Sequence, residues 1–482
     1  MSYPGEEFDV ESRALLLPHD YENPRPKSRY HLVVVGAGPA GLICAIGAAG
    51  LGAKVALVER GMMGGDCLNV GCVPSKALLE ITKHKEGATF ADAFAWLREV
   101  RASIAPHDSV ARYTELGVDV FLGDAHFNEK GSVVVADVEL PARRIAVCTG
   151  ARADIPPIAG LVDAAPLTNE TVFDLETQPG ALSILGAGPI GCELATVFAR
   201  LGTRVDLFEM AERVLPMELP EASDAVAARL AELGVAIHVG LPVSEVLVEA
   251  SQKKVVCGDM SVKSDEVLVA LGRRSNVETL QLVNAGVNLD SRGFIATDAK
   301  LRTSNKNVFA AGDCTGRPQF THNADAHARV IVQNALFAPT ASIVASSPVP
   351  RCTYTQPEVA SVGIAPAELE RQQIATDVYQ VDFGDLDRGR TQVDGGGFVR
   401  VHTRRGMDKI LFATIVGHDA GEQIAPLCLM MTNGLGLSAA GSTLIPYPTR
   451  AEYLKRLADA YNHTRLTPFV AKLFERWLNF TS

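Results

Sequence analysis

The sequence predicts an α/β protein with two Rossmann-like dinucleotide-binding domains and a C-terminal α+β interface domain. The first observation is an internal repeat, in which the segment at residues 36–59 recurs at residues 186–209. The second is that each copy lies between two apolar, strand-like segments, which is the pattern of a βαβ unit. The third is that strand-like segments precede helical ones after residue 349, as in a separate α+β domain.

Length and composition set the broad class of the protein. The chain has 482 residues, which corresponds to two to four domains at about 100–200 residues each. Its net charge is −11, and sequence-independent binding of nucleic acid requires basic patches, so we expect no nucleic-acid partner. A hydrophobic fraction of 47% is ordinary for a globular protein and excludes a disordered chain.

We expect a cytoplasmic protein without a transmembrane segment. The uncharged run at residues 32–53 is long enough to span a bilayer, but its glycines and proline predict a turn between a buried strand and a buried helix. The N-terminus is acidic and has no basic region followed by an apolar one, so no signal peptide is expected. Most of the nine cysteines are single residues in apolar surroundings, which indicates a reducing compartment.

Both copies of the repeat contain the fingerprint of a dinucleotide-binding turn. The first glycine permits the tight turn, the second lets the backbone approach a pyrophosphate, and the third lets helix and strand pack closely. The phosphates would meet the positive end of the helix dipole, and a glutamate about 20 residues on would accept hydrogen bonds from a ribose diol. The predicted cofactor-binding residues are Gly36, Gly38, Pro39, Ala40, Gly41 and Glu59 in the first copy, and Gly186, Gly188, Pro189, Ile190, Gly191 and Glu209 in the second.

Segments rich in glycine and proline indicate where the domains begin and end. The segment at 148–160 predicts a crossover between domains, and the one at 265–276 predicts the return crossover. A strand ends at Gly312-Asp313, where an acidic residue is well placed to contact a cofactor. We expect an N-terminal arm at 1–29, a first dinucleotide-binding domain at 30–155 and 278–345, a second at 156–277, a linker at 339–350 and the interface domain at 349–482.

Two closely spaced cysteines follow the first repeat, in the segment GGDCLNVGCVPSK. Cys67 and Cys72 can close a small disulfide if the turn between them brings their Cα atoms within about 4.4–6.8 Å. The helical run that follows places them near a helix N-terminus, where the dipole and Lys76 favour a thiolate. A strained, partly exposed disulfide in the cytosol is usually catalytic. The alternatives are a metal half-site, for which no further Cys or His ligands are evident, and two free thiols.

In this order, the motifs resemble those of the flavoprotein disulfide reductases, the family of dihydrolipoamide dehydrogenase, glutathione reductase and mercuric reductase. The resemblance covers roughly residues 30–470 and rests on GAGPAG, GGDCLNVGCVPSK, GAGPIGCE, AAGD and the C-terminal α/β domain. Three further segments are most similar to mercuric reductase-like proteins: PQFTHNADAHARVIVQNAL, DLDRGRTQ and PYPTRAEYLKRLADAYNHTRLTP.

The resemblance implies a homodimer that binds FAD in the first dinucleotide-binding domain and NAD(P)H in the second. It implies that electrons pass from NAD(P)H through the flavin to a Cys67–Cys72 disulfide by way of Cys72, and that the freed Cys67 thiolate attacks a small-molecule or metal-ion acceptor. Lys76 would pair with Glu193 beside the flavin. The other implied residues are Arg60, Gly65, Asp66, Gly150, Gly312 and Asp313 for FAD and Gly272 for NAD(P)H, with no resident metal site.

The end of the second fingerprint bears on the choice of nicotinamide. Glu209 favours NADH, because a carboxylate accepts from the free 2′-hydroxyl and repels a 2′-phosphate. Arg204 and Arg213 lie nearby in the sequence and leave use of NADPH open.

One position departs from the disulfide-reducing members of this family. Those members carry His-Pro-Thr…Glu near the C-terminus, where the histidine of the partner subunit protonates the leaving thiolate; here Tyr447 replaces the histidine and Glu452 is retained. A phenol with a pKa near 10 is a poor general base at neutral pH, although it can donate a proton or a hydrogen bond. Mercuric reductase is similar to this chain in carrying a tyrosine there, and a metal ion needs no proton transfer. The alternative is that Tyr447 is only a packed interface aromatic.

The leading hypothesis is an FAD-dependent, NAD(P)H-driven oxidoreductase whose cysteine pair reduces a thiophilic metal ion or an unusual disulfide. Efficient reduction of mercury is opposed by the lack of the C-terminal cysteine pair and the N-terminal CxxC domain of mercuric reductase. His322 and His327 either assist proton transfer or are hydrogen-bonded residues at a helix start. Three alternatives remain: dihydrolipoamide dehydrogenase, which the missing histidine opposes; a diaphorase or quinone reductase that uses flavin alone; and a non-enzymatic flavin-binding redox sensor.

Overall fold

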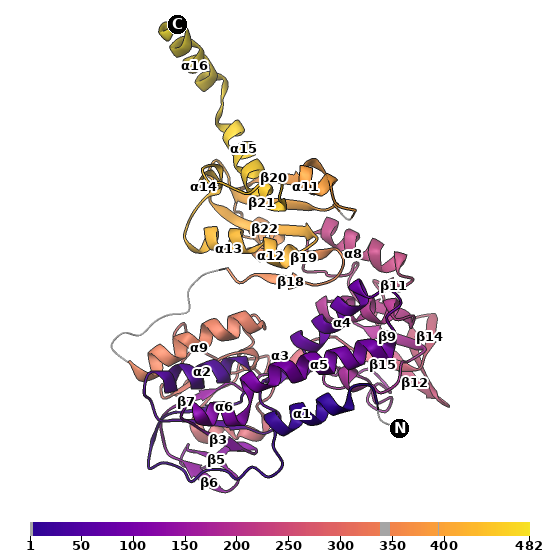
Figure 1. Ribbon diagram of the computed structural model, residues 1–482, viewed down its shortest axis with the longest axis vertical. Helices are drawn as coiled ribbons and strands as arrows, with labels where there is room; N and C mark the ends of the chain where they lie inside the picture. Colours follow the sequence, from indigo (N-terminus) through magenta and orange to yellow (C-terminus); the bar gives the residue numbers. More distant parts are fainter. Residues whose placement is uncertain (1–2, 338–347, 394) are drawn as a thin grey trace. The chain divides into compact units, whose positions relative to one another are not determined.

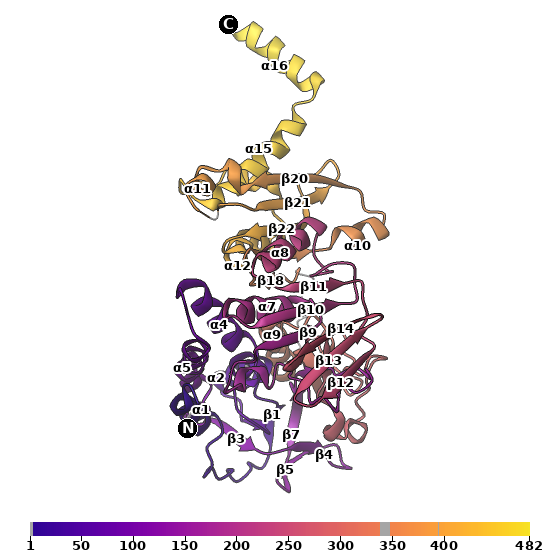
Figure 2. The same cartoon turned by 90° about the vertical axis from the view of Figure 1, so that its right-hand side faces the viewer.

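The structure is a computed structural model that describes residues 3–337, 348–393 and 395–482 (Figures 1 and 2). It divides into two compact units: Met1–Glu212 with Leu233–Ala345, and Arg213–Glu232 with Ser346–Ser482. Most of the predicted linker at 339–350 lies outside the described residues.

The first unit contains a five-stranded parallel sheet with the first glycine turn at the end of its central strand. Helices α2 and α9 pack on each other and on this sheet, so its strands are almost continuously apolar. The strand order is β17 (Val308–Ala310), β7 (Ala142–Val147), β1 (Tyr30–Val35), β2 (Val55–Glu59) and β3 (Val118–Leu122). The helices of this unit are α1 (Glu6–Leu16), α2 (Pro39–Gly50), α3 (Gly65–Asn69), α4 (Cys72–His84), α5 (Phe90–Asp108), α6 (Val110–Glu115), α7 (Pro189–Arg200) and α9 (Thr321–Leu336).

A second parallel sheet in the same unit carries the second copy of the repeat. Its strand order is β11 (Ala236–Val239), β10 (Arg204–Glu209), β9 (Ala181–Leu185) and β15 (Glu266–Val269). The repeat extends to the strand register, because Leu32 pairs with Val55 in the first sheet and Leu182 pairs with Val205 in the second. The two βαβ units predicted from the sequence are therefore confirmed.

The two predicted crossovers run side by side as antiparallel strands. They form β8 (Ala151–Ala153) and β16 (Arg273–Ser275), in which Ala151 pairs with Ser275. Two small antiparallel sheets complete the first unit: β4 (Ala125–Phe127), β5 (Val133–Val135) and β6 (Val138–Leu140), and β12 (Glu245–Glu249), β13 (Gln252–Cys257) and β14 (Met260–Ser264).

The second unit is built on a five-stranded antiparallel sheet. It contains the segment at 349–482 expected to form an α+β domain, together with residues 213–232, which were expected in the second dinucleotide-binding domain. The strand order is β18 (Arg351–Thr353), β19 (Glu358–Gly363), β22 (Ile410–Gly417), β21 (Phe398–Arg404) and β20 (Thr376–Asp382). Its helices are α8 (Pro220–Glu232), α10 (Pro366–Arg371), α11 (Asp387–Arg390), α12 (Ala420–Gln423), α13 (Ala425–Thr432), α14 (Leu437–Gly441), α15 (Tyr453–Arg465) and α16 (Pro468–Thr481). Helix α8 belongs to this unit, where its Glu221 forms an ion pair with Arg400 of β21.

The N-terminal arm contains a helix that the sequence did not predict. Helix α1 packs along α5, and its Asp9 pairs with two arginines of that helix. The helix is held by the ion pairs of Asp9 and by burial of Leu16 in the core, and its acidic residues are interspersed with apolar ones.

Helix α16 exposes a row of large apolar side chains. Trp477 is 63% exposed and Phe480 is 84% exposed, and Phe469, Leu473, Phe474 and Leu478 are also exposed. Among residues 3–337, 348–393 and 395–482, every helix is too short or too polar to span a lipid bilayer.

Candidate functional site

The two glycine turns require glycine at their first and third positions. Gly36 has a φ of +103°, and a Cβ on Gly41 would lie 1.8 Å from the carbonyl oxygen of Gly36. The second copy repeats this arrangement, with a φ of +104° at Gly186 and a Cβ on Gly191 lying 1.9 Å from the oxygen of Gly186. Each helix therefore starts in direct contact with its turn, and no side chain fits between them.

The second glycine of each turn faces open space, as a pyrophosphate requires. A Cβ on Gly188 would meet nothing within 4 Å, and one on Gly38 would meet only the Cα of Gly65, at 3.7 Å. Pro189 and Pro39 begin the helices, whose first N–H groups have no partner within the helix. Gly65 has a φ of +60° and comes so close to Gly38 that a Cβ would be 2.5 Å from the Gly38 Cα. These residues fit a bound dinucleotide in both turns.

The two fingerprint glutamates lie beside the glycine turns. Glu59 accepts hydrogen bonds from the backbone N–H groups of Ala37, at 2.6 Å, and Gly61, at 2.8 Å. Glu209 makes the equivalent two bonds in the second copy, both 2.9 Å long. Burial raises the pKa of Glu59, and its backbone hydrogen bonds oppose that shift. A ribose hydroxyl at either turn would therefore meet a carboxylate oxygen.

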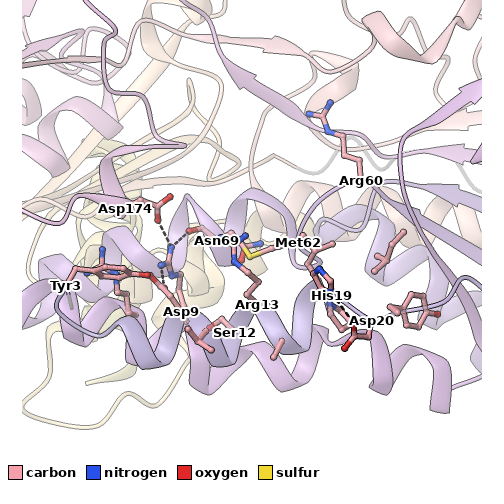
Figure 3. Close-up of a pocket in the computed structure, with 18 of the residues that line it drawn as sticks. Tyr3, Asp9, Ser12, Arg13, His19, Asp20, Arg60, Met62, Asn69 and Asp174 are labelled. Carbon is pink, nitrogen blue, oxygen red and sulfur yellow. Dashed lines mark hydrogen bonds and ion pairs between the residues drawn. The ribbon is translucent and has the colours of Figure 1, made fainter. Parts of the chain in front are cut away.

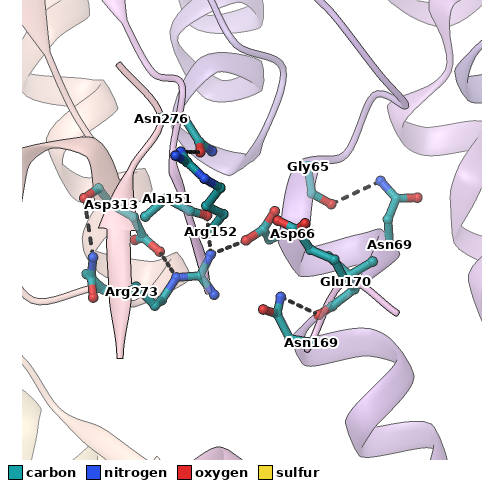
Figure 4. A network of polar contacts seen from close by, with 12 residues as sticks. Gly65, Asp66, Asn69, Ala151, Arg152, Asn169, Glu170, Arg273, Asn276 and Asp313 are labelled. Atoms are coloured by element: carbon teal, nitrogen blue, oxygen red, sulfur yellow. Dashed lines mark hydrogen bonds and ion pairs between the residues drawn. The ribbon is translucent and has the colours of Figure 1, made fainter. Parts of the chain in front are cut away.

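A polar network connects Asp66 and Asp313, which were predicted to hold FAD (Figure 4). Arg273 lies between them: its guanidinium is hydrogen-bonded to Asp66, and its Nε is 3.5 Å from Asp313 Oδ2. Burial raises the pKa of Asp313, and Arg273 opposes that shift. The sequence reading missed Arg273, although the turn beginning at Gly272 was a signal that the chain returns to the first domain here.

The remaining predicted cofactor residues lie in several separate turns and loops. Gly150 lies at the start of the outward crossover with a φ of +68°, and Gly312 precedes Asp313 with a φ of +78°. Gly272 directly precedes Arg273, so it lies next to the predicted FAD residues as well as at the end of the second sheet. The Arg60 side chain is exposed.

The cysteine pair lies where two helices meet. Cys67 is in α3 and Cys72 is the first residue of α4. In the reduced pair, Cys67 donates a hydrogen bond to Cys72. This hydrogen bond lowers the pKa of Cys72 to about 6, helped by the charge of Lys76 and opposed by burial. The same hydrogen bond and burial raise the pKa of Cys67. At neutral pH, Cys72 is thus the thiolate and Cys67 keeps its proton.

Two side chains from other elements lie at the start of α4: Glu193 of α7, which pairs with Lys76, and Thr321 of α9, which contacts Cys72. Lys76 Nζ lies 2.8 Å from Glu193 Oε2, and the Glu193 side chain on α7 is 5% exposed. Thr321, the first residue of α9, has its hydroxyl oxygen 3.7 Å from Cys72 Sγ. Thr321 was missed because its place in the sequence, far from the cysteines, carries no sign of contact with them.

In the second unit, Tyr447 is 71% exposed and donates a hydrogen bond of 2.5 Å to Asp387 Oδ2. This bond and the negative charge of Asp387 raise the pKa of Tyr447. Glu452, which the resemblance placed in the same motif, pairs instead with Arg456 at 3.0 Å. The sequence reading therefore missed Asp387, which is the phenol's hydrogen-bond acceptor.

The other histidines and cysteines are mostly structural in character. Burial lowers the pKa of His327 to about 4, with a smaller contribution from Arg317, so His327 is neutral at physiological pH. The His322 ring stacks on Phe320, with ring centroids 5.3 Å apart. The cysteines outside the pair are buried or half-buried: Cys44, Cys148, Cys192, Cys257, Cys314, Cys352 and Cys428. In the part of the chain that the structure describes, no three His, Cys, Asp or Glu side chains come together as a metal-ligand set.

Comparisons with known proteins match one family of oxidoreductases along nearly the whole chain. Residues 30–328 match the family described as pyridine nucleotide-disulphide oxidoreductase, and residues 349–458 match its dimerisation domain. A mercuric reductase of Streptomyces lividans is 33% identical over 469 residues, covering 92% of this chain and 98% of its own length. A dihydrolipoyl dehydrogenase of Haloarcula marismortui is 32% identical, covering 89% of this chain and 95% of its own.

Solved structures give the same result. The HOCl-induced flavoprotein disulfide reductase RclA from Escherichia coli superimposes with a TM-score of 0.81 at 28% identity, covering 89% of this chain and 99% of its own. The Cu(II) complex of the same protein superimposes with a TM-score of 0.82, covering 90% of this chain and 100% of its own.

Proposed function

Since this chain belongs to the pyridine nucleotide-disulphide oxidoreductases, which act on sulfur groups or mercury, we propose that it transfers electrons from NADH to a thiophilic metal ion. Bound FAD would supply two-electron transfer from the nicotinamide to the Cys67–Cys72 pair. The first glycine turn, with Glu59, Asp66 and Asp313, would hold that FAD.

The cysteine pair is suited to bind and reduce a soft metal ion. A reduced pair contains the Cys72 thiolate next to the Cys67 thiol, and thiolates are soft ligands that select soft metal ions. Binding of the ion by both sulfurs displaces the Cys67 proton. Return of the pair to a disulfide releases two electrons, enough for one mercury(II) ion to become the metal or for two copper(II) ions to become copper(I).

The observation that carries the choice of a metal ion is the state of Tyr447. Reduction of a disulfide needs a group that takes up and returns a proton at the leaving thiolate. The phenol donates a hydrogen bond to Asp387, which raises its pKa, so it keeps its proton at neutral pH and is a poor base. A metal ion leaves without proton transfer, which makes a phenol sufficient at this position.

Dihydrolipoamide dehydrogenase is the second candidate function. It is favoured by the similarity to the dihydrolipoyl dehydrogenase of Haloarcula marismortui. That protein is 32% identical to this chain, nearly the same as the 33% of the mercuric reductase of Streptomyces lividans. The difference at Tyr447 allows the two candidates to be separated by experiment.

An acceptor screen tests the proposal. NADH oxidation by the FAD-loaded enzyme is measured with mercury(II), copper(II), lipoamide, glutathione disulfide and a quinone. We expect a metal ion to be reduced at least tenfold faster than either disulfide. Tyr447→His should raise lipoamide turnover by about 10²-fold, the usual size of a general acid–base contribution, and Tyr447→Phe should not. Faster reduction of lipoamide than of any metal ion by the unaltered enzyme would contradict the proposal.

We propose NADH as the preferred nicotinamide, on the position of Glu209 at the second turn. Arg204 begins strand β10, at the opposite end from Glu209, and its guanidinium donates to the carbonyl of Lys263. Glu209→Ser should lower the NADH-over-NADPH preference, measured as the ratio of kcat/KM values, by about tenfold, since one hydrogen bond to a charged group is lost. The same change in the first copy, Glu59→Ser, should weaken FAD retention and leave that ratio unchanged. An unchanged ratio in Glu209→Ser would contradict the assignment.

We propose that the protein works as a homodimer and that a second copy covers the apolar face of α16. Residues 349–458 match a dimerisation domain, which ends within α15, and α16 is the next helix along the chain. A helix of 14 residues is marginal on its own in water, so the exposed Phe469, Phe474 and Trp477 indicate a surface that covers them.

Removal of α16 tests this assignment. Truncation before Pro468 should weaken the dimer by at least tenfold in sedimentation experiments, and replacing the polar-face Lys472 by Gln should not. A truncated chain that dimerises as tightly as the full chain, or a full chain that binds lipid vesicles through α16, would contradict the assignment.

A further inference from the structure

The loop between the two redox cysteines is held by side chains from outside it. Arg101 Nη1 donates to the carbonyl of Asn69 at 3.0 Å, and Asn169 Nδ2 donates to the carbonyl of Val70 at 3.2 Å. Figure 4 shows Asn69 and Asn169. The Asn69 amide itself donates to the carbonyl oxygens of Met63 and Gly65, both at 3.0 Å. Two neighbouring backbone carbonyls between Cys67 and Cys72, those of Asn69 and Val70, are therefore held by side chains that are distant in the sequence.

Arg101 is oriented by the N-terminal helix. Its Nη2 is 2.5 Å from Asp9 Oδ1 on α1, while Nε of the neighbouring Arg98 is 3.0 Å from Asp9 Oδ2. One carboxylate thus binds two guanidinium groups, of which Arg98 is 0% exposed and Arg101 is 6% exposed. Figure 3 shows Asp9, Asn69 and Asp174 converging on this cluster. Asp174 is the weaker second partner of Arg101, at 3.5 Å and with a side chain 62% exposed.

Removal of this carboxylate would leave two buried cations without their main counter-ion. A buried charge that loses its partner is strongly unfavourable, so the arginines would move toward solvent or toward other acceptors. Arg101 would then no longer hold Asn69 in place. Asp9 lies in the N-terminal arm, before residue 30, where the match to the family begins.

We propose that helix α1 is a positioning element for the redox centre: Asp9 fixes Arg101, and Arg101 fixes the Asn69 carbonyl and so the distance between the Cys67 and Cys72 sulfurs. The proposal rests on the redox role given to the cysteine pair, but it does not depend on the identity of the acceptor. Asp9 acts through Arg101 and touches neither sulfur nor cofactor.

The experiment measures the dithiol–disulfide equilibrium of the pair in the full chain against dithiothreitol. In this exchange, two protein thiols are oxidised to the disulfide while oxidised dithiothreitol is reduced, and alkylation followed by mass spectrometry counts the products. Asp9→Asn should lower the equilibrium constant for disulfide formation by at least tenfold, because the sulfurs are no longer held together. Asp9→Glu, which keeps the charge, should recover most of it. Glu7→Gln, an exposed position on the same helix, should behave as the unaltered protein.

A second variant keeps the test decisive if Asp9→Asn fails to fold. Arg101→Lys retains the charge but cannot reach Asp9 and Asn69 with the fixed fork of a guanidinium, and it should show the same loss. Circular dichroism and flavin content establish which variants are folded. If folded Asp9→Asn or Arg101→Lys has the equilibrium constant of the unaltered protein, the positioning role is wrong. The acceptor screen is unaffected by that outcome, so the two proposals fail separately.

Discussion

Replacement of either Cys67 or Cys72 by serine should lower metal-ion-dependent NADH oxidation by about 10³-fold or more. A serine hydroxyl is not ionised at neutral pH and is a hard ligand, so it can neither bind a soft metal ion nor form a disulfide. In Cys67→Ser the thiolate at Cys72 remains but has no partner to oxidise with. In Cys72→Ser the group that would exchange electrons with the flavin is lost.

Two controls separate the loss of metal-ion reduction from a general loss of folding or flavin binding. Quinone reduction, which needs only the flavin, should persist in both variants. Cys428→Ser should retain metal-ion reduction because Cys428 packs against the hydrophobic core of its own unit. Stopped-flow and steady-state measurements of NADH consumption provide the readout. Metal-ion reduction within a few-fold of the unaltered enzyme in both serine variants would mean that the flavin alone reduces the acceptor.

Gly41→Ala and Gly191→Ala should abolish two different cofactor interactions. A Cβ at either position would lie less than 2 Å from a carbonyl oxygen, at 1.8 Å and 1.9 Å, so the turn and helix must separate at a cost of about 3 kcal/mol. Gly41→Ala should be purified without flavin. Gly191→Ala should keep its flavin but lose reduction by NADH, while dithionite still reduces it.

Gly50→Ala is the matched control, since it lies at the exposed end of the same helix as Gly41 and its Cβ would meet nothing within 4 Å. Flavin absorbance and the rate of anaerobic reduction by NADH distinguish the three variants. Retention of flavin by Gly41→Ala, or reduction of Gly191→Ala by NADH at the normal rate, would show that the turns do not hold the cofactors assigned to them.

Local patterns in the sequence predicted the βαβ units well, because a glycine turn, an apolar strand and a terminal glutamate each specify their own backbone geometry. In the structure the two copies of the repeat also share the same strand register, and Glu59 and Glu209 accept equivalent backbone hydrogen bonds. The pairing of Lys76 with Glu193 came from family resemblance, and the structure places these side chains 2.8 Å apart.

Contacts between residues distant in sequence could not be predicted from one chain. Thr321 beside Cys72, Arg273 between two aspartates, and Asp387 as the acceptor for Tyr447 all depend on tertiary packing. Helix α1 also was not predicted, and the arginines that pair with its Asp9 lie far from it in the sequence.

Anaerobic titration of the FAD-loaded enzyme with NADH is the most direct test of the account. After two electrons, we expect a long-wavelength absorbance band from the Cys72 thiolate beside oxidised flavin. The band should fade as the pH falls below about 6, because lowering the pH through the pKa of Cys72 protonates the thiolate. Direct formation of reduced flavin, with no such band at neutral pH and the Cys67–Cys72 pair still oxidised, would contradict the central claim that electrons pass through these two sulfurs.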